Sequence, residues 1–339
     1  MAIDVHGHLT SPELFRRYPM PPSLADVEGM LEAKAAAGIT TTVVGSPVGA
    51  GTMVKTPGVD NYRQPAGDLE RFHDWLGEQV RAHPGSLRAY AYVNPLGGDA
   101  EWERAAKRLE QPEFVGLIVN SSVQGRFLDG PEADGFFAMA AHHGAPVMLH
   151  PPAEPAGGAA LDDLRLVEQI ARPADVTTGT AAVLFAGWLR KYPALRIIAP
   201  VCGGGLPLLL ERLERARRMP PGFGGGPPGN TGQAPAPADP PPPLADELRR
   251  VHVDTATPSR RALAAAVDAF GVHNVLFGTD TPPMSAPLPE SLHRLDQLGL
   301  PEEHLELIRA GNARRIFDLP QAAPAGGAAE HRIAQEVRR

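Results

Sequence analysis

Three histidines and one aspartate stand at the ends of apolar runs, and their types suit metal binding. His6 and His8 flank Gly7 near the N-terminus. Side chains two residues apart on a strand point to the same face, so these two imidazoles would converge on one point. His150 and Asp280 end two later apolar runs. Imidazole nitrogens and a carboxylate oxygen are suitable ligands for Zn²⁺, Mn²⁺ or Fe²⁺.

Any one of these residues alone would be an ordinary polar residue at a strand end. Together, His6, His8, His150 and Asp280 predict a site for a divalent cation, with zinc as the first choice and iron or manganese as alternatives. This ligand set leaves a position open for water or substrate, as catalytic sites do. The partner that we expect is therefore a small-molecule substrate.

The elements that must hold these residues alternate along the chain. Most of the β-rich runs are apolar nearly throughout, which is typical of parallel strands buried on both faces. The eight predicted strands are 3–8, 40–45, 89–94, 115–120, 146–150, 196–201, 251–254 and 275–280. The predicted helices are 24–37, 69–82, 100–110, 133–143, 177–191, 206–218 and 260–270.

This alternation predicts an α/β protein, a (β/α)₈ TIM barrel, whose chemistry lies at the carboxyl ends of the strands. A doubly wound open sheet is the alternative, but no glycine-rich phosphate motif follows the first strand. We expect one barrel domain over residues 1–319. A Pro/Gly-rich insertion at 220–243 cannot hold a helix or a central strand, and residues 320–339 form a flexible tail.

Composition excludes several classes of protein. The chain has 339 residues and a formal net charge of −7, and this mild acidity argues against a nucleic-acid partner. No stretch approaches the ~20 apolar residues that cross a bilayer, so no membrane partner is expected. The N-terminus lacks the features of a signal peptide. The single cysteine, Cys202, excludes an intramolecular disulfide and suits a reducing compartment, so we expect a cytoplasmic protein.

Five motifs give the chain a family resemblance. They are Ile-Asp-Val-His-Gly-His at 3–8, Pro-Val-Met-Leu-His-Pro-Pro at 146–152, Cys-Gly-Gly-Gly-Leu-Pro at 202–207, Asp-Thr-Ala at 254–256 and Leu-Phe-Gly-Thr-Asp-Thr-Pro at 276–282. Over residues 1–318 the chain resembles the amidohydrolase superfamily, in the branch that includes aminocarboxymuconate-semialdehyde decarboxylase. The resemblance implies the same four metal ligands and a homo-oligomer. It also implies decarboxylation or hydrolysis of a small carboxylated or cyclic organic substrate.

The sequence departs from this family pattern at the sixth strand, which normally ends in a histidine that acts on metal-bound water. The matching position is Cys202, or Val201 in a second register. A buried thiol is a poor general base, and Cys202 could equally be a small core residue. We therefore keep Cys202 and Asp254 as candidate catalytic residues beside Asp280. His252 is a further candidate for moving protons.

This departure leaves two other functions open. A nonheme iron monooxygenase on the amidohydrolase fold, of the kind found in bacterial natural-product biosynthesis, would need no base beside a bound water. A non-catalytic barrel that binds a ligand is the third hypothesis. Two residues are candidates for substrate binding. Asn120 ends the fourth strand, and Arg63, in the long loop after the second strand, could pair with a carboxylate.

Overall fold

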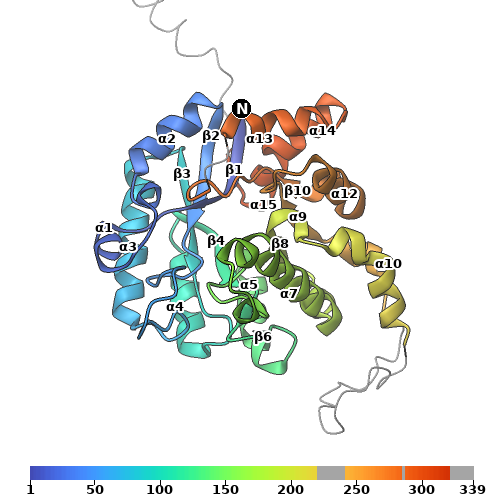
Figure 1. The fold of residues 1–339 in the computed structure, drawn as a ribbon, viewed down its shortest axis with the longest axis horizontal. Coiled ribbons are helices and arrows are strands. Elements are labelled where there is room, and N and C mark those ends of the chain that lie inside the picture. The colour runs from blue at the N-terminus through green and yellow to red at the C-terminus, as the bar shows by residue number, and fades with distance from the viewer. Residues whose placement is uncertain (220–240, 285–286, 321–339) are drawn as a thin grey trace, which may run out of the picture.

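Eight parallel strands form one sheet in the computed structural model, which describes residues 1–219, 241–284 and 287–320 (Figure 1). The spatial order is β1-β2-β3-β4-β7-β8-β9-β10. The strands are β1 Ala2–His8, β2 Ile39–Gly45, β3 Leu87–Tyr92, β4 Phe114–Asn120, β7 Pro146–His150, β8 Arg196–Ala199, β9 Val251–Asp254 and β10 Val275–Leu276. All eight predicted strands are present, and most of the predicted tail and insertion lies outside the described residues.

Hydrogen bonds between the first and last strands close the sheet into a barrel. The backbone N–H of Val5 donates to the carbonyl of Phe277 at 2.9 Å, and that of Asp280 donates to the carbonyl of His6 at 2.8 Å. The predicted (β/α)₈ barrel is therefore confirmed. The last strand is shorter than predicted because pairing with β9 stops at Leu276, and the chain then runs on to Asp280 beside β1.

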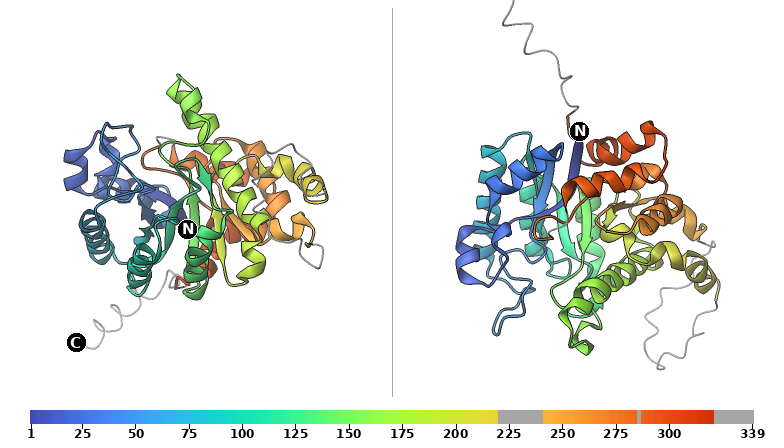
Figure 2. Two further views of the ribbon diagram at one scale, coloured as in Figure 1. Left: turned by 90° about the horizontal axis from the view of Figure 1, so that it is seen from below. Right: turned by 45° about the horizontal axis from the view of Figure 1, so that its top comes forward.

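Helices surround the strands in all views (Figure 2). They are α1 Pro12–Arg17, α2 Val27–Ala36, α3 Ala66–Ala82, α4 Asp99–Leu109, α5 Asp134–His142, α6 Leu164–Leu166, α7 Arg172–Ala186, α8 Trp188–Lys191, α9 Pro200–Gly203, α10 Leu206–Arg217, α11 Leu244–Leu248, α12 Arg260–Phe270, α13 Leu288–Asp296, α14 Glu302–Glu306 and α15 Asn312–Ile316. A hairpin of β5 Ser122–Val123 and β6 Arg126–Phe127 follows β4. The seven predicted helices are all found, whereas the hairpin and the helices after β10 were not predicted.

Two apolar clusters stabilise the barrel. The outer one packs the strands against the helices, and the inner one fills the barrel with Tyr90, Ile118, Met148 and other strand residues. Phe317, after α15, belongs to the inner cluster, with its ring centroid 5.8 Å from that of Tyr90. The last helix thus helps to close one end of the barrel and leaves chemistry to the other. No helix of the described residues is long and apolar enough to span a membrane.

A buried histidine makes the stability of the barrel depend on pH. The Nε2 atom of His73 in α3 accepts a hydrogen bond from the backbone N–H of Tyr92 at 3.0 Å. Burial, and then the charge of Arg108, lower the pKa of His73 from 6.5 to about 3. The unfolded chain therefore takes up this proton at a higher pH than the folded chain does. Its contribution to stability is full above pH 6.5 and is lost as the pH falls toward 3.

We expect this histidine to cost the protein about 2 kcal/mol of unfolding free energy between pH 7 and pH 5. Urea unfolding at both values measures the loss. The variant His73→Gln keeps a hydrogen-bond acceptor but cannot be protonated in this range, so it should lose about 2 kcal/mol less on acidification. Equal losses in the two proteins would show that His73 is not responsible.

Candidate metal centre

The four predicted ligands meet at the carboxyl ends of β1 and β7 and in the segment after β10. One donor atom from each of His6, His8, His150 and Asp280 lies within 4.8 Å of the others. The Nε2 atoms of His6 and His8 are 3.1 Å apart. Oδ1 of Asp280 is 3.1 Å from Nε2 of His8 and 3.5 Å from Nε2 of His6. The ring centroid of His150 lies 4.9 Å from that of His8 and 5.3 Å from that of His6.

The other nitrogen of each imidazole is held from behind. Nδ1 of His6 lies 2.6 Å from Oδ2 of Asp254. Nδ1 of His8 lies 3.1 Å from the carbonyl of Gly45, and that of His150 lies 2.8 Å from the carbonyl of Pro151. These oxygens accept hydrogen bonds, so each Nδ1 carries the hydrogen and each Nε2 keeps a lone pair. Such outer partners orient histidine ligands in metal sites.

This donor set fits a divalent cation. Donors held about 2.1 Å from one ion in tetrahedral or octahedral geometry lie about 3.0–3.4 Å from each other, close to the spacing of the His6, His8 and Asp280 donors. Three buried lone pairs that face one another without a shared cation would be unfavourable. The four residues therefore fit a divalent cation better than they fit a purely structural cluster.

Charge within the cluster shifts the pKa values of its members. Burial disfavours the charged form of His6, but the carboxylates of Asp280 and Asp254 outweigh burial and raise its pKa from 6.5 to about 9. Burial, together with the nearby His8 and His6, lowers the pKa of His150 well below 6.5. Burial opposes ionisation of Asp280, yet the neighbouring histidines hold its pKa far below the ordinary value. Asp280 is therefore an anionic donor throughout the neutral range.

Tight backbone packing brings the ligands together. Gly278 allows the close approach, since a Cβ there would lie 2.8 Å from Cβ of Asp254 and 3.1 Å from Cβ of His6. Asp280 itself has a φ of +55°, a left-handed conformation that aspartate adopts more readily than most residues. The chain thus turns sharply after β10, and the Asp280 carboxylate reaches the histidines.

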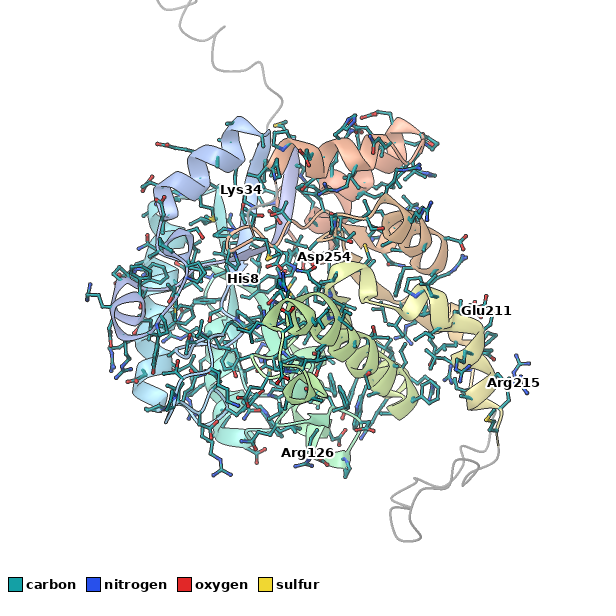
Figure 3. The ribbon with its side chains drawn as sticks, in the orientation of Figure 1. His8, Lys34, Arg126, Glu211, Arg215 and Asp254 are labelled. Atoms are coloured by element: carbon teal, nitrogen blue, oxygen red, sulfur yellow. The ribbon has the colours of Figure 1, made fainter. Side chains whose placement is uncertain are left out.

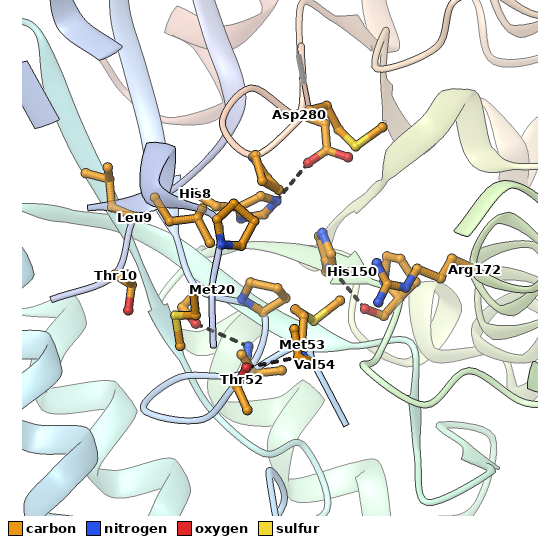
Figure 4. Close-up of a pocket in the computed structure, with 18 of the residues that line it drawn as sticks. His8, Leu9, Thr10, Met20, Thr52, Met53, Val54, His150, Arg172 and Asp280 are labelled. Carbon is orange, nitrogen blue, oxygen red and sulfur yellow. Dashed lines mark hydrogen bonds and ion pairs between the residues drawn. The ribbon is translucent and has the colours of Figure 1, made fainter. Parts of the chain in front are cut away.

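A cavity of about 420 Å³ opens from the cluster (Figure 4). His6, His8, His150 and Asp280 lie at one part of its wall. Most of the remaining wall is apolar and includes Leu9, Met20, Leu24, Val48, Met53 and Val54. Within the described lining, the other charged side chains are Glu168 and Arg172. The cavity therefore favours a compact, largely apolar small molecule that can reach the cluster.

The sixth strand leads to Val201, not to Cys202, at the cavity. Val201 lines the cavity, whereas Cys202 is buried in the outer apolar cluster. Burial, and then the charge of Asp254, raise the pKa of the Cys202 thiol. Its expected role at the reacting centre is therefore corrected, because the thiol packs as a small core residue and is fully protonated. Both residues have positive φ, and this turn gives adjacent residues very different surroundings.

Asp254 lies behind His6 rather than in the cavity. Besides His6, its carboxylate accepts hydrogen bonds from the backbone N–H groups of Val201 at 2.7 Å and Ala256 at 3.0 Å. It is therefore a positioning residue and not a base that touches substrate, which corrects the catalytic role first considered. His252 does not line the cavity, and burial followed by the charge of Arg315 lowers its pKa to about 4.

The two predicted substrate-binding residues lie away from the cavity lining. Asn120 is buried, and its amide donates to the carbonyl of Pro47 at 2.9 Å while its oxygen accepts from the Tyr92 hydroxyl at 3.3 Å. It holds the loop after β2 in place. Arg63 is exposed on that loop and does not line the cavity. Neither residue contacts the space next to the cluster in this structure.

A buried lysine that the sequence analysis missed ties the cluster to its scaffold. Lys34 in α2 is 2% exposed and pairs with the carboxylate of Asp4 (Figure 3). Its Nζ also donates to Oγ1 of Thr279 at 2.8 Å. Asp4 in turn accepts from the backbone N–H groups of His6 at 2.9 Å and Thr279 at 3.1 Å. The network joins the two chain segments that carry His6 and Asp280.

We expect Lys34→Met to lower the unfolding free energy by about 3–5 kcal/mol, because it leaves Asp4 as an unpaired buried charge. Urea unfolding measures the loss. Lys55→Met is the matched control, since Lys55 is 86% exposed and its replacement should change little. The double variant Asp4→Asn/Lys34→Met should recover part of the stability. A Lys34→Met protein as stable as the wild type would contradict this role.

The fold and the site together define a (β/α)₈ barrel with a metal-binding cluster at the carboxyl ends of its strands. The family model described as Amidohydrolase matches residues 3–319. The chain therefore belongs to this amidohydrolase family.

Three known proteins are similar to the chain. A 2-amino-3-carboxymuconate-6-semialdehyde decarboxylase of Dictyostelium discoideum is 26% identical over 220 residues, which cover 65% of this chain and 58% of that protein. The match thus spans less than two thirds of this relative. The 5-carboxyvanillate decarboxylase of Sphingomonas paucimobilis has a TM-score of 0.76 at 20% identity, covering 94% of this chain and 99% of its own. A dihydroxybenzoic acid decarboxylase of Polaromonas sp. JS666, with bound manganese and 2-nitroresorcinol, has a TM-score of 0.70 at 20% identity, covering 95% and 98%. The two solved structures share the fold of this chain.

Proposed function

We propose that the chain is a metal-dependent carboxy-lyase that decarboxylates a small carboxylated organic substrate. The observation that carries the proposal is the four-residue donor cluster at the inner part of a mostly apolar cavity. The names of the similar proteins, all decarboxylases, support the same reaction class. Zinc remains our first choice for these ligands, and the manganese in one similar structure makes manganese the first alternative.

In this proposal the cation, held by His6, His8, His150 and Asp280, supplies Lewis-acid stabilisation of the negative charge that develops on the substrate. The three histidines act through Nε2, and Asp254 and the two backbone carbonyls hold the rings in place. The Asp280 carboxylate faces the cavity with 25% of its side chain exposed, so we assign it the proton transfer to the substrate carbon. The apolar walls exclude water and favour the loss of a charged carboxylate as CO₂.

Hydrolysis is the second candidate, but it needs a base beside a water molecule. Val201 occupies the cavity position at the end of the sixth strand, and its side chain cannot take a proton. The variant Val201→His would place an imidazole there, and histidine tolerates the left-handed backbone of this residue better than valine. Under our proposal this variant gains ester or amide hydrolysis that the natural protein lacks. Hydrolysis by the natural protein would favour this second candidate.

Release of CO₂ from carboxylated aromatic and unsaturated acids, by protein loaded with Zn²⁺ or Mn²⁺, tests the proposal. The assay is run in air and under strict anaerobiosis, with chelator-treated protein as the control. We expect metal-dependent release at equal rates in both atmospheres. Turnover that consumes O₂ and needs iron would replace the proposal with the monooxygenase. Absence of release from every acid would contradict it. A cytoplasmic location and assembly as a homo-oligomer remain part of the proposal.

A further inference from the structure

Arg172 is a charged group in a cavity wall that is otherwise mainly apolar. It is the first residue of α7, and its side chain is 16% exposed. Its guanidinium points to the side of the cavity where His150 lies (Figure 4). Arginine at such a place is costly unless acceptors satisfy its donors, because a desolvated guanidinium needs hydrogen bonds.

The partners of Arg172 within the described residues leave one donor unused. Nη1 pairs with the carboxylate of Glu168, which is 37% exposed. The buried Nε–H has no hydrogen-bond partner among the described residues. Buried donors are nearly always satisfied, so an unpaired one beside a ligand cavity indicates that a ligand supplies the acceptor.

The backbone that carries Arg172 is unusual as well. Residues Val167–Ala171 form a π-helical turn between α6 and α7, and both Glu168 and Arg172 line the cavity. This segment projects beyond the barrel in the left view of Figure 2. Such turns are rare and occur mostly at functional sites, where they re-aim side chains. The sequence therefore spends an irregular turn where its one cavity-lining arginine in the described residues begins a helix.

We propose that Arg172 binds an anionic group of the substrate at a second point, away from the group that meets the cation. The substrate class is then a compact apolar skeleton with two acidic groups. A carboxylate matches the guanidinium edge and accepts two hydrogen bonds. It displaces the partly exposed Glu168, which holds Arg172 when the cavity contains no anion. This inference rests on the proposed function and narrows its substrate.

Binding of isophthalate and of its monoamide, 3-carbamoylbenzoate, to Mn²⁺-loaded protein tests the inference by calorimetry. The two probes share size and skeleton but differ by one charge. We expect the wild type to bind isophthalate at least about tenfold more tightly than the monoamide, as a charge-assisted hydrogen bond allows. Arg172→Met should lose this preference. Glu168→Gln should keep it and bind isophthalate more tightly, because the competing carboxylate is gone.

Arg165→Met is the matched control, since Arg165 lies on the same segment and is 89% exposed. It should bind both probes as the wild type does. Metal content measured on the same samples separates the two hypotheses. If the wild type takes up no metal, the proposed function fails. If metal binding is intact but Arg172→Met keeps the preference, or the wild type binds neither probe, the inference about Arg172 fails alone.

Discussion

The variant His150→Ala is expected to lose metal binding and, with it, all metal-dependent turnover. His150 is 5% exposed and directs its Nε2 toward His6 and His8 while the Pro151 carbonyl holds Nδ1. Its removal takes away one of four donors, and the strands that carry the other three cannot move inward to replace it. We expect affinity for Mn²⁺ or Zn²⁺ to fall by more than about 100-fold, the upper range for loss of an outer partner alone.

Metal titration against a competing chelator measures this loss, and thermal unfolding gives an independent reading. A cation that binds the folded state raises the melting temperature, so added Mn²⁺ should stabilise the wild type and not His150→Ala. His143→Ala is the matched control, because His143 is exposed at the end of α5. His150→Ala protein that still binds one ion with wild-type affinity would remove His150 from the ligand set.

The variant Asp254→Asn is expected to weaken metal binding although Asp254 touches neither cation nor substrate. The carboxylate accepts from Nδ1 of His6 and from two backbone N–H groups. An asparagine amide must turn its NH₂ group toward one of these donors. If it faces His6, the imidazole has to carry its hydrogen on Nε2, where the lone pair is needed for the metal.

We expect Asp254→Asn to lower metal affinity by about 10–100-fold, as other outer-partner substitutions do, and turnover with it. Asp268→Asn, on the exposed face of α12, is the control and should behave as the wild type. Saturating metal should restore much of the lost activity, because the four ligands are unchanged. A variant with full affinity but no turnover would instead make Asp254 a catalytic residue.

The sequence alone predicts the barrel and its metal ligands well. Parallel strands buried on both faces are continuous apolar runs, and eight such runs alternate with amphipathic stretches. The His6-Gly7-His8 spacing directly implies two side chains on one strand face. His150 and Asp280 follow because strand ends in a barrel share one rim.

Details that depend on backbone conformation could not be read from the sequence. Two left-handed residues in succession decide whether Val201 or Cys202 faces the cavity, and no spacing rule indicates such a turn. Arg172 reaches the cavity through a π-helical turn that shifts the helical register. Asn120 does end its strand as predicted, but it is used up by bonds to Pro47 and Tyr92.

Lys34 is different, because a signal for it was present in the sequence. Met30 lies on the buried face of the predicted helix 24–37, and Lys34 follows it by four residues. Residues four apart on a helix share a face, so a lysine here implies a buried charge and hence a buried carboxylate partner. Asp4, two residues before His6 on a buried strand, was the available partner.

The central claim is that His6, His8, His150 and Asp280 hold one divalent cation. Anomalous diffraction from crystals grown with Mn²⁺ tests it most directly, because the manganese signal locates the ion without reference to activity. We predict one strong peak among the four side chains, about 2.0–2.3 Å from the three Nε2 atoms and an oxygen of Asp280. A peak elsewhere, or none at this cluster in metal-soaked crystals, would contradict the account.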